Sequence, residues 1–208
     1  MKKNKLILFD WGGVVEPQEE GFIKAYKGLF KSFGYDKENV IDSVRKYRLS
    51  SIKTIEGYKK VFNKIIKDFG INVSFEEYIE SYYKIFMKIK HYKDVANYEI
   101  SLKDKCYIGI LSNLAVIDYE RIDKQLGLSN YDYLFLSYEL ECQKPDKKIY
   151  EKVQDSVPFK PSDILFIDDL EKNINTAKKM GWNVCQASGL ELDKIKQACE
   201  EFLKEESI

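Results

Sequence analysis

Five short apolar runs along the chain each end in a turn or a polar residue. Runs of this length are typical of strands that are buried on both faces of a parallel sheet. They are Leu6–Phe9, Tyr107–Leu111, Tyr133–Leu136, Ile164–Ile167 and Asn183–Gln186. Between them, apolar residues recur every three to four positions, which predicts helices at 117–126, 145–156, 171–180 and 190–204. Because strands and helices alternate, we expect an α/β fold with a doubly wound parallel sheet.

The middle of the chain, residues 17–98, has a different pattern. Its apolar positions, such as Phe22, Tyr26, Leu29 and Phe33, recur at helical spacing throughout. This predicts an all-helical insertion with four helices, near 19–33, 37–48, 54–69 and 75–91. We therefore expect two units, a core formed by residues 1–16 and 99–208 and a helical insertion formed by residues 17–98.

Composition excludes several classes of protein. The 208 residues are 44% hydrophobic, and 34 Lys and Arg balance 34 Asp and Glu, so we expect a globular chain that binds neither nucleic acid nor membranes through bulk charge. The basic start at Lys2 and Lys3 leads into only four apolar residues, fewer than an export signal or a membrane span needs. The four cysteines form no CxxC pair and are expected to be reduced thiols. These observations favour a cytoplasmic protein and say nothing about its oligomeric state.

Charge is unevenly distributed between the two predicted units. Residues 17–98 hold 16 Lys and Arg against 11 Asp and Glu, so the insertion is basic and the core acidic. This suits a small anionic substrate held between them. The insertion is also rich in tyrosine, and the candidates for lining a pocket there are Tyr26, Tyr47, Tyr82 and Tyr83.

Polar residues follow the predicted strands at the edge where parallel sheets bind ligands. They are Asp10 after the first strand, Ser112 and Asn113 after the second, Lys144 in a loop after the third, and Asp168 with Asp169 after the fourth. Three carboxylates at one edge require a cation, and an all-oxygen ligand set points to Mg²⁺. One carboxylate can then attack phosphorus while Ser112, Asn113 and Lys144 bind and neutralise the phosphoryl group.

The order and spacing of these residues resemble the haloacid dehalogenase-like hydrolase superfamily over essentially the whole chain. The matching motifs are Leu6-Ile7-Leu8-Phe9-Asp10, Leu111-Ser112-Asn113, Lys144-Pro145-Asp146 and Phe166-Ile167-Asp168-Asp169 with Asn173. The resemblance implies a Rossmann-like core with a helical cap inserted after the first strand. The acidic pair Asp168-Asp169 favours the phosphatase branch, because the dehalogenases use no metal.

The resemblance also implies roles for individual residues. It makes Asp10 the nucleophile that forms an aspartyl-phosphate, Ser112 and Asn113 the phosphate binders and Lys144 the charge anchor. The Mg²⁺ ligands it implies are Asp10, Asp168, Asp169 and the backbone carbonyl of Gly12. Trp11, next to the nucleophile, is expected to pack under the flap, the turn that follows the first strand, or to line the entrance, where it could stack on substrate. Cys142 lies close to Lys144 in sequence and is expected to be an incidental thiol.

The sequence departs from the family pattern at Gly12. Phosphatases of this family usually carry an Asp there, which protonates the leaving group and later activates water. Losing such a group typically costs about 10²–10⁴-fold in rate, which leaves a slow enzyme, a replacement acid or an activated leaving group such as a sugar 1-phosphate. Glu16 could swing in as an acid, although a surface role is the simpler interpretation. His91, the single histidine, is interpreted as a solvated or core residue and not as the acid.

The hypothesis from the sequence is therefore a Mg²⁺-dependent hydrolase of small phosphate monoesters, with a sugar phosphate as the first substrate to test. Two alternatives remain. One is a binding protein with weak or no turnover, favoured by Gly12, and the other is a metal-independent 2-haloacid dehalogenase.

Overall fold

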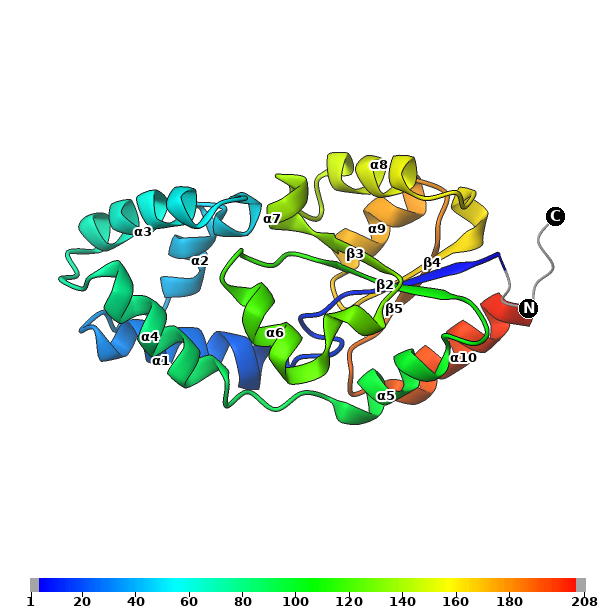
Figure 1. Cartoon of the computed structure of the whole chain (residues 1–208), viewed down its shortest axis with the longest axis horizontal. Coiled ribbons are helices and arrows are strands. Elements are labelled where there is room, and N and C mark those ends of the chain that lie inside the picture. Colours follow the sequence, from blue (N-terminus) through cyan, green and yellow to red (C-terminus); the bar gives the residue numbers. More distant parts are fainter. Residues whose placement is uncertain (1–3, 205–208) are drawn as a thin grey trace.

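A parallel five-stranded sheet forms the core of the computed structural model, which describes residues 4–204 (Figure 1). The strand order is β3-β2-β1-β4-β5, and every neighbouring pair is parallel. The strands are β1 (Leu6–Phe9), β2 (Tyr107–Ser112), β3 (Tyr133–Leu136), β4 (Ile164–Asp168) and β5 (Asn183–Gln186). The predicted α/β class is thus confirmed, and two of the five predicted strands are one residue longer than expected.

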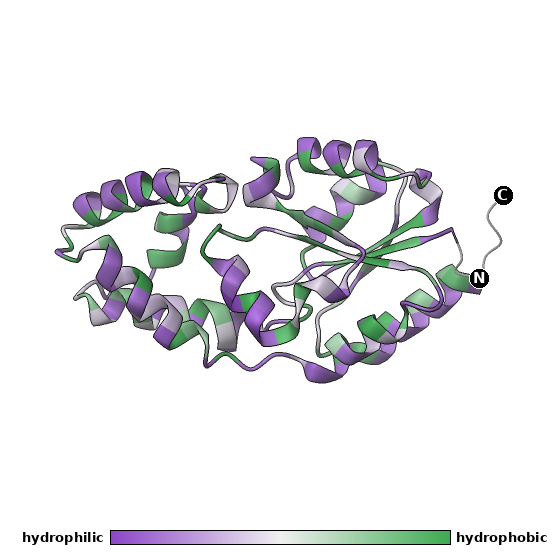
Figure 2. Ribbon diagram, viewed as in Figure 1, coloured by the Kyte–Doolittle hydropathy of each residue, from purple (hydrophilic) through white to green (hydrophobic). Residues whose placement is uncertain are grey.

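Alternate side chains along the strands pack into two separate apolar layers, one on each face of the sheet. In β1, Ile7 and Phe9 pack with α5 (Lys93–Ser101) and α10 (Leu192–Lys204) on one face. Leu6 and Leu8 pack with α8 (Lys147–Ser156) and α9 (Glu171–Lys179) on the other. Successive side chains in a strand point to opposite faces, so a strand covered on both faces is apolar at every position. Figure 2 shows the same continuous apolar character along the central strands.

Helices cover both faces of this sheet, as in a doubly wound fold. In Figure 1, α8 and α9 lie above the sheet and α5 and α10 lie below it. The helices around the sheet are α5 (Lys93–Ser101), α6 (Asp118–Leu126), α7 (Ser137–Leu140), α8 (Lys147–Ser156), α9 (Glu171–Lys179) and α10 (Leu192–Lys204), with short turns at η3 (Leu128–Asn130) and η4 (Pro161–Asp163). The four helices predicted between the strands are present within two residues of their expected bounds.

The predicted helical insertion forms a lobe with its own apolar cluster, at the left of Figure 1. Its elements are η1 (Gln18–Ile23), α1 (Lys24–Ser32), α2 (Val40–Arg45), η2 (Leu49–Ser51), α3 (Ile55–Phe69) and α4 (Phe75–Phe86). Local signals explain two of the starts. Thr54 caps α3 by accepting from the Gly57 N–H, and Ser74 forms a capping box with Glu77 at α4.

Residues just before 98, where the sequence predicts the end of the lobe, pack with the core. Helix α5 begins at Lys93, and its Val95 and Ala96 belong to the apolar layer under the sheet. We did not expect a helix here, because its weak amphipathic pattern continues that of the lobe. The packing leads us to propose a cap that ends near residue 92.

The structure bears on part of what the sequence predicts about a membrane span, the basic start of the chain and the cysteines. Within residues 4–204, no helix is long and apolar enough to cross a membrane. Lys2 and Lys3 lie outside the described residues. All four cysteines are buried and free of disulfides, as expected for reduced thiols.

Glu99 on α5 is a fully buried carboxyl group. Its Oε2 accepts a hydrogen bond of 2.6 Å from the Tyr131 hydroxyl, and its Oε1 is buried without a hydrogen-bond partner in the described part of the chain. Burial raises the pKa of Glu99 from 4.5 to about 8, against a smaller opposite effect of the Tyr131 bond.

We predict that Glu99 makes the fold less stable as the pH rises. A carboxyl whose folded pKa is raised binds more protons in the folded state between its two pKa values, so stability falls across the window from 4.5 to about 8. Glu99→Gln removes this contribution, and its melting temperature should exceed that of the wild type more at about pH 9 than at about pH 5. Each kcal/mol corresponds to about 2–4 °C for a chain of this size. An equal difference at both pH values would contradict the assignment.

Candidate active site

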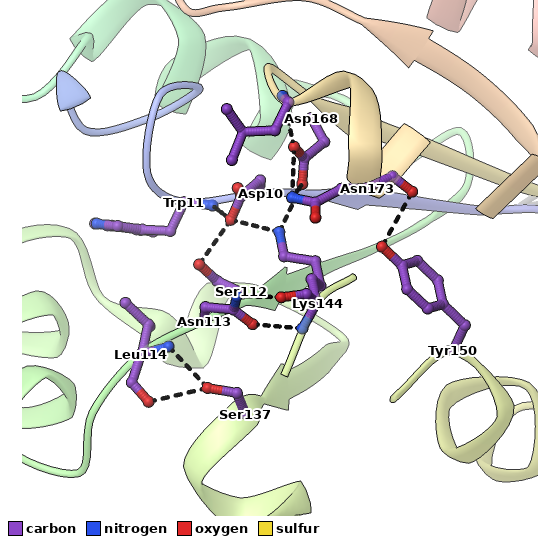
Figure 3. Close-up of polar contacts among 11 residues, drawn as sticks. Asp10, Trp11, Ser112, Asn113, Leu114, Ser137, Lys144, Tyr150, Asp168 and Asn173 are labelled. Carbon is purple, nitrogen blue, oxygen red and sulfur yellow. Dashed lines mark hydrogen bonds and ion pairs between the residues drawn. The ribbon is translucent and has the colours of Figure 1, made fainter. Parts of the chain in front are cut away.

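The carboxyl ends of three neighbouring strands bring the predicted site residues together (Figure 3). Asp10 follows β1, Ser112 ends β2 and Asp168 ends β4, and β1 lies between β2 and β4 in the sheet. Their side chains therefore meet at one edge, as the sequence predicted. Lys144 reaches the same point from the loop between α7 and α8.

Asp10 is held by three donors on one oxygen. Its Oδ1 accepts from the Trp11 N–H at 2.6 Å and the Ser112 hydroxyl at 2.7 Å, and it lies 2.9 Å from Lys144 Nζ. The side chain is almost fully buried. Burial raises the pKa of Asp10 to about 7, Lys144 opposes the shift, and the neighbouring Asp168 adds to it.

Lys144 is a buried cation between two carboxylates. Its Nζ lies 2.6 Å from Asp168 Oδ2 as well as 2.9 Å from Asp10. Burial lowers the pKa of Lys144, but the two carboxylates outweigh burial and the pKa stands above its usual value. Lys144 is therefore charged, and it is the cation that the structure supplies at this point.

Asn113, predicted to bind phosphate, hydrogen-bonds through its side chain to the backbone of Lys144. Its Nδ2 donates to the Lys144 carbonyl at 2.9 Å, and its Oδ1 accepts from the Lys144 N–H at 2.8 Å. The amide thus fixes the backbone of the loop that carries the lysine. The peptide bond from Lys144 to Pro145 is cis.

Asp168 and Asp169 are adjacent but have different partners. Asp168 accepts from the Asn173 amide at 2.9 Å on both oxygens and from the Leu170 N–H at 2.8 Å. Asp169 Oδ1 is buried and has no hydrogen-bond partner among residues 4–204. Burial raises the pKa of Asp169 to about 6, and the charge of Asp168 adds to the shift.

The three carboxylates fit a divalent metal ion. Asp10, Asp168 and Asp169 each offer an oxygen within 4.8 Å of the other two. Lys144 offsets only part of their charge, and the orphaned Asp169 oxygen would gain a partner from a cation. Gly13, with φ of 88°, leaves the space for Asp169, because a Cβ there would lie 2.4 Å from its carboxyl. Mg²⁺, the cofactor predicted from the sequence, prefers all-oxygen donors such as these.

A cavity of about 380 Å³ opens between this site and the helical lobe. Asp10, Trp11, Gly12, Ser112 and Asn113 line it from the sheet side. From the lobe, the cavity receives Tyr26 and Tyr82, which the sequence proposed, and Tyr58, which it did not. Tyr47 and Tyr83 instead donate to Asp68 and to the Ile117 carbonyl.

The loop that carries Lys144 also contacts the lobe. Gln143 Oε1 accepts from the hydroxyls of Ser50 and Ser51 at 3.0 and 3.1 Å, and Asp146 pairs with Arg48. The same loop therefore connects the carboxylate site to the far wall of the cavity. The nearby Cys142 is buried, and burial raises its pKa, as expected for an inert thiol.

The interpretation of Glu16 as a surface residue is wrong. Glu16 is buried, and its two oxygens lie 2.6 and 3.4 Å from the guanidinium of Arg121, a fully buried residue of α6. His91 Nε2 lies 3.2 Å from Glu16, and the His91 ring meets Trp11 edge-on, so His91 is a core residue. Sequence reasoning missed Arg121 because helix α6 is otherwise strongly polar and gives no sign of a buried cation. Burial alone would raise the pKa of Glu16, but His91 and Arg121 together lower it.

We predict that Arg121→Met destabilises the fold by about 3–5 kcal/mol, since it leaves a buried carboxylate without its cation. Glu16→Gln in that background should recover part of the loss, because it removes the unpaired charge. Urea denaturation of the two single variants and the double variant measures the coupling. Strictly additive effects would contradict a direct Glu16–Arg121 pairing.

Comparisons with known proteins agree with this geometry. The chain matches the haloacid dehalogenase-like hydrolase family over residues 7–187. It is 28% identical over 194 residues to the D-ribitol-5-phosphate phosphatase of Bacteroides thetaiotaomicron, covering 88% of this chain and 91% of the relative.

Solved structures share the fold. A family enzyme from Bacteroides thetaiotaomicron, in complex with magnesium and inorganic phosphate, aligns with a TM-score of 0.71 and 21% identity over 91% of this chain and 96% of that one. A HAD-like family hydrolase of Porphyromonas gingivalis aligns with a TM-score of 0.75 and 20% identity over 98% and 99%. The chain belongs to the haloacid dehalogenase-like hydrolase family, and the prediction of its phosphatase branch is confirmed.

Proposed function

We propose that this chain is a Mg²⁺-dependent phosphatase of small sugar or sugar-alcohol phosphates and that Asp10 is its nucleophile. The observation that carries the proposal is the setting of Asp10. Within residues 4–204, its three polar contacts fall on Oδ1, so Oδ2 is left for bond formation at the wall of the cavity. A carboxylate fixed in one orientation is suited to attack a bound phosphoryl group.

The metal ion would be held by Asp10, Asp168 and Asp169, with the Gly12 carbonyl as the further ligand that the sequence suggested. When bound, Mg²⁺ supplies Lewis-acid neutralisation of phosphoryl charge. Lys144 adds a fixed positive charge beside Asp10, and the Ser112 hydroxyl orients the attacking carboxylate.

The reaction proceeds in two displacements at phosphorus. First, Asp10 Oδ2 bonds to phosphorus, the bond to the ester oxygen breaks, and the ester oxygen leaves with the electron pair and takes a proton from water. Then a water oxygen bonds to phosphorus, the bond to Asp10 breaks, and the water proton passes to solvent. The products are the alcohol, inorganic phosphate and the regenerated Asp10 carboxylate.

The substrate class is supported by the cavity and by a relative. A volume of about 380 Å³ suits a small ester, and the tyrosines Tyr26, Tyr58 and Tyr82 line the cavity on the side of the lobe. The phosphatase from Bacteroides thetaiotaomicron is named for D-ribitol 5-phosphate. Sugar-alcohol phosphates are therefore the first substrates to test.

The two alternatives fit the site less well. A dehalogenase without metal has no use for the orphaned oxygen of Asp169 beside two further carboxylates. A protein that only binds has no need to bury acids whose charges repel one another, at a cost of several kcal/mol per ion.

The test is phosphate release from D-ribitol 5-phosphate and a panel of sugar phosphates, with Mg²⁺ and with EDTA. We expect turnover by the wild type with Mg²⁺ and background release with EDTA or with Asp10→Asn. Asp193→Asn on the exposed face of α10 is the matched control and should retain full activity. A folded protein that binds Mg²⁺ and hydrolyses no ester would contradict the proposal, and halide release unaffected by EDTA would replace it with the dehalogenase.

A further inference from the structure

The space beside Gly12 is filled by the side chain of Gln18, the first residue of η1. A Cβ placed on Gly12 would lie 2.7 Å from Gln18 Oε1, closer than real Cβ contacts. Gly12, Gln18 and Asp10 all line the same cavity. Gly12, two residues after Asp10, therefore makes room for the neutral amide of Gln18.

Among residues 4–204, every carboxylate that lines this cavity besides Asp10 already has hydrogen-bond or ion-pair partners. In the described part of the chain, the carboxylates that line it besides Asp10 are Glu16 and Asp118. Glu16 is paired with Arg121, and both oxygens of Asp118 accept hydrogen bonds, from the Tyr82 hydroxyl and the Ala115 N–H. Both groups are thus held as acceptors.

We infer that Gln18 takes part in the reaction by hydrogen bonding and does not transfer a proton. Its amide N–H donates to the ester oxygen as that oxygen becomes negative, and its carbonyl accepts from the water that attacks in the second step. The proton on the departing oxygen comes from solvent water. This inference rests on the proposed function and adds a residue to it.

A consequence of this arrangement is a strong dependence of rate on the leaving group. An amide stabilises a departing oxygen anion but leaves most of its charge in place, whereas an acid would neutralise it. The wild type should hydrolyse esters of acidic alcohols, such as 4-nitrophenyl phosphate, faster than alkyl phosphates. Loss of the amide should widen that difference.

The experiment compares kcat and KM for an alkyl phosphate and 4-nitrophenyl phosphate, with Mg²⁺, in the wild type and Gln18→Met. Methionine keeps the length of the side chain and removes its hydrogen bonds. We expect kcat for the alkyl ester to fall about tenfold, with a smaller fall for the aryl ester and little change in KM. Gln197→Met, an exposed glutamine on α10, is the matched control and should change neither rate.

Gly12→Ala tests the contact itself. The added Cβ displaces the amide, so this variant should show the same selective loss for the alkyl ester. Added to Gln18→Met, it should cause less further loss than it does alone, because the amide is already gone. Melting temperatures near that of the wild type establish that the variants fold.

Two outcomes would overturn the inference, and they are distinguishable. Wild-type turnover with equal kcat values and an equal alkyl-to-aryl ratio in Gln18→Met and Gln197→Met would remove Gln18 from the reaction and leave the proposed function intact. Failure of the wild type itself to release phosphate from either ester would overturn the proposed function and this inference with it.

Discussion

The buried Lys144 organises the edge of the sheet where the strands have their carboxyl ends. The Lys144 ammonium lies within 2.9 Å of carboxylates that end two neighbouring strands, and both carboxylates are buried. Breaking such a pairing by removing the cation is costly, because it leaves uncompensated charge in the interior. Surrounding hydrogen bonds preserve the pairing, since the Asn113 side chain bonds to the backbone of Lys144 and the Asn173 amide donates to Asp168.

The same lysine leaves the site short of positive charge. Asp10 and Asp168 share the ammonium group of Lys144, and the pKa of Asp10 and that of Asp169 are raised, to about 7 and about 6. Burial is the main cause, and mutual repulsion adds to it. A divalent ion would offset this repulsion and give the unpartnered Asp169 oxygen a partner, so a bound metal would complete the electrostatics of this edge of the sheet.

Sequence patterns predicted the features that depend on local chemistry. Buried parallel strands are apolar at every position, so all five strands could be located, and the polar residues predicted to follow them do lie close together at one edge of the sheet. The role of Glu16, the burial of Arg121 and the packing of α5 could not be predicted, because each depends on which distant segment comes to lie alongside. Gln18 was missed for the same reason: only the folded flap brings its amide against Gly12.

Asn113 shows what a motif leaves open. The motif predicts a phosphate binder at this position, and the structure adds two hydrogen bonds from its side chain to the backbone of Lys144. These bonds could not be predicted, because hydrogen-bond partners across the fold are not recorded in the spacing along the chain.

The proposed chemistry depends on phosphorylation of Asp10 during turnover. Acid-quenching the protein during hydrolysis of 4-nitrophenyl phosphate with Mg²⁺, followed by measuring the mass of the peptide that contains Asp10, detects this intermediate. We expect one added phosphoryl group on that peptide, absent when EDTA replaces Mg²⁺. Turnover with a phosphoryl group on another residue, and none on the peptide that contains Asp10, would contradict this intermediate.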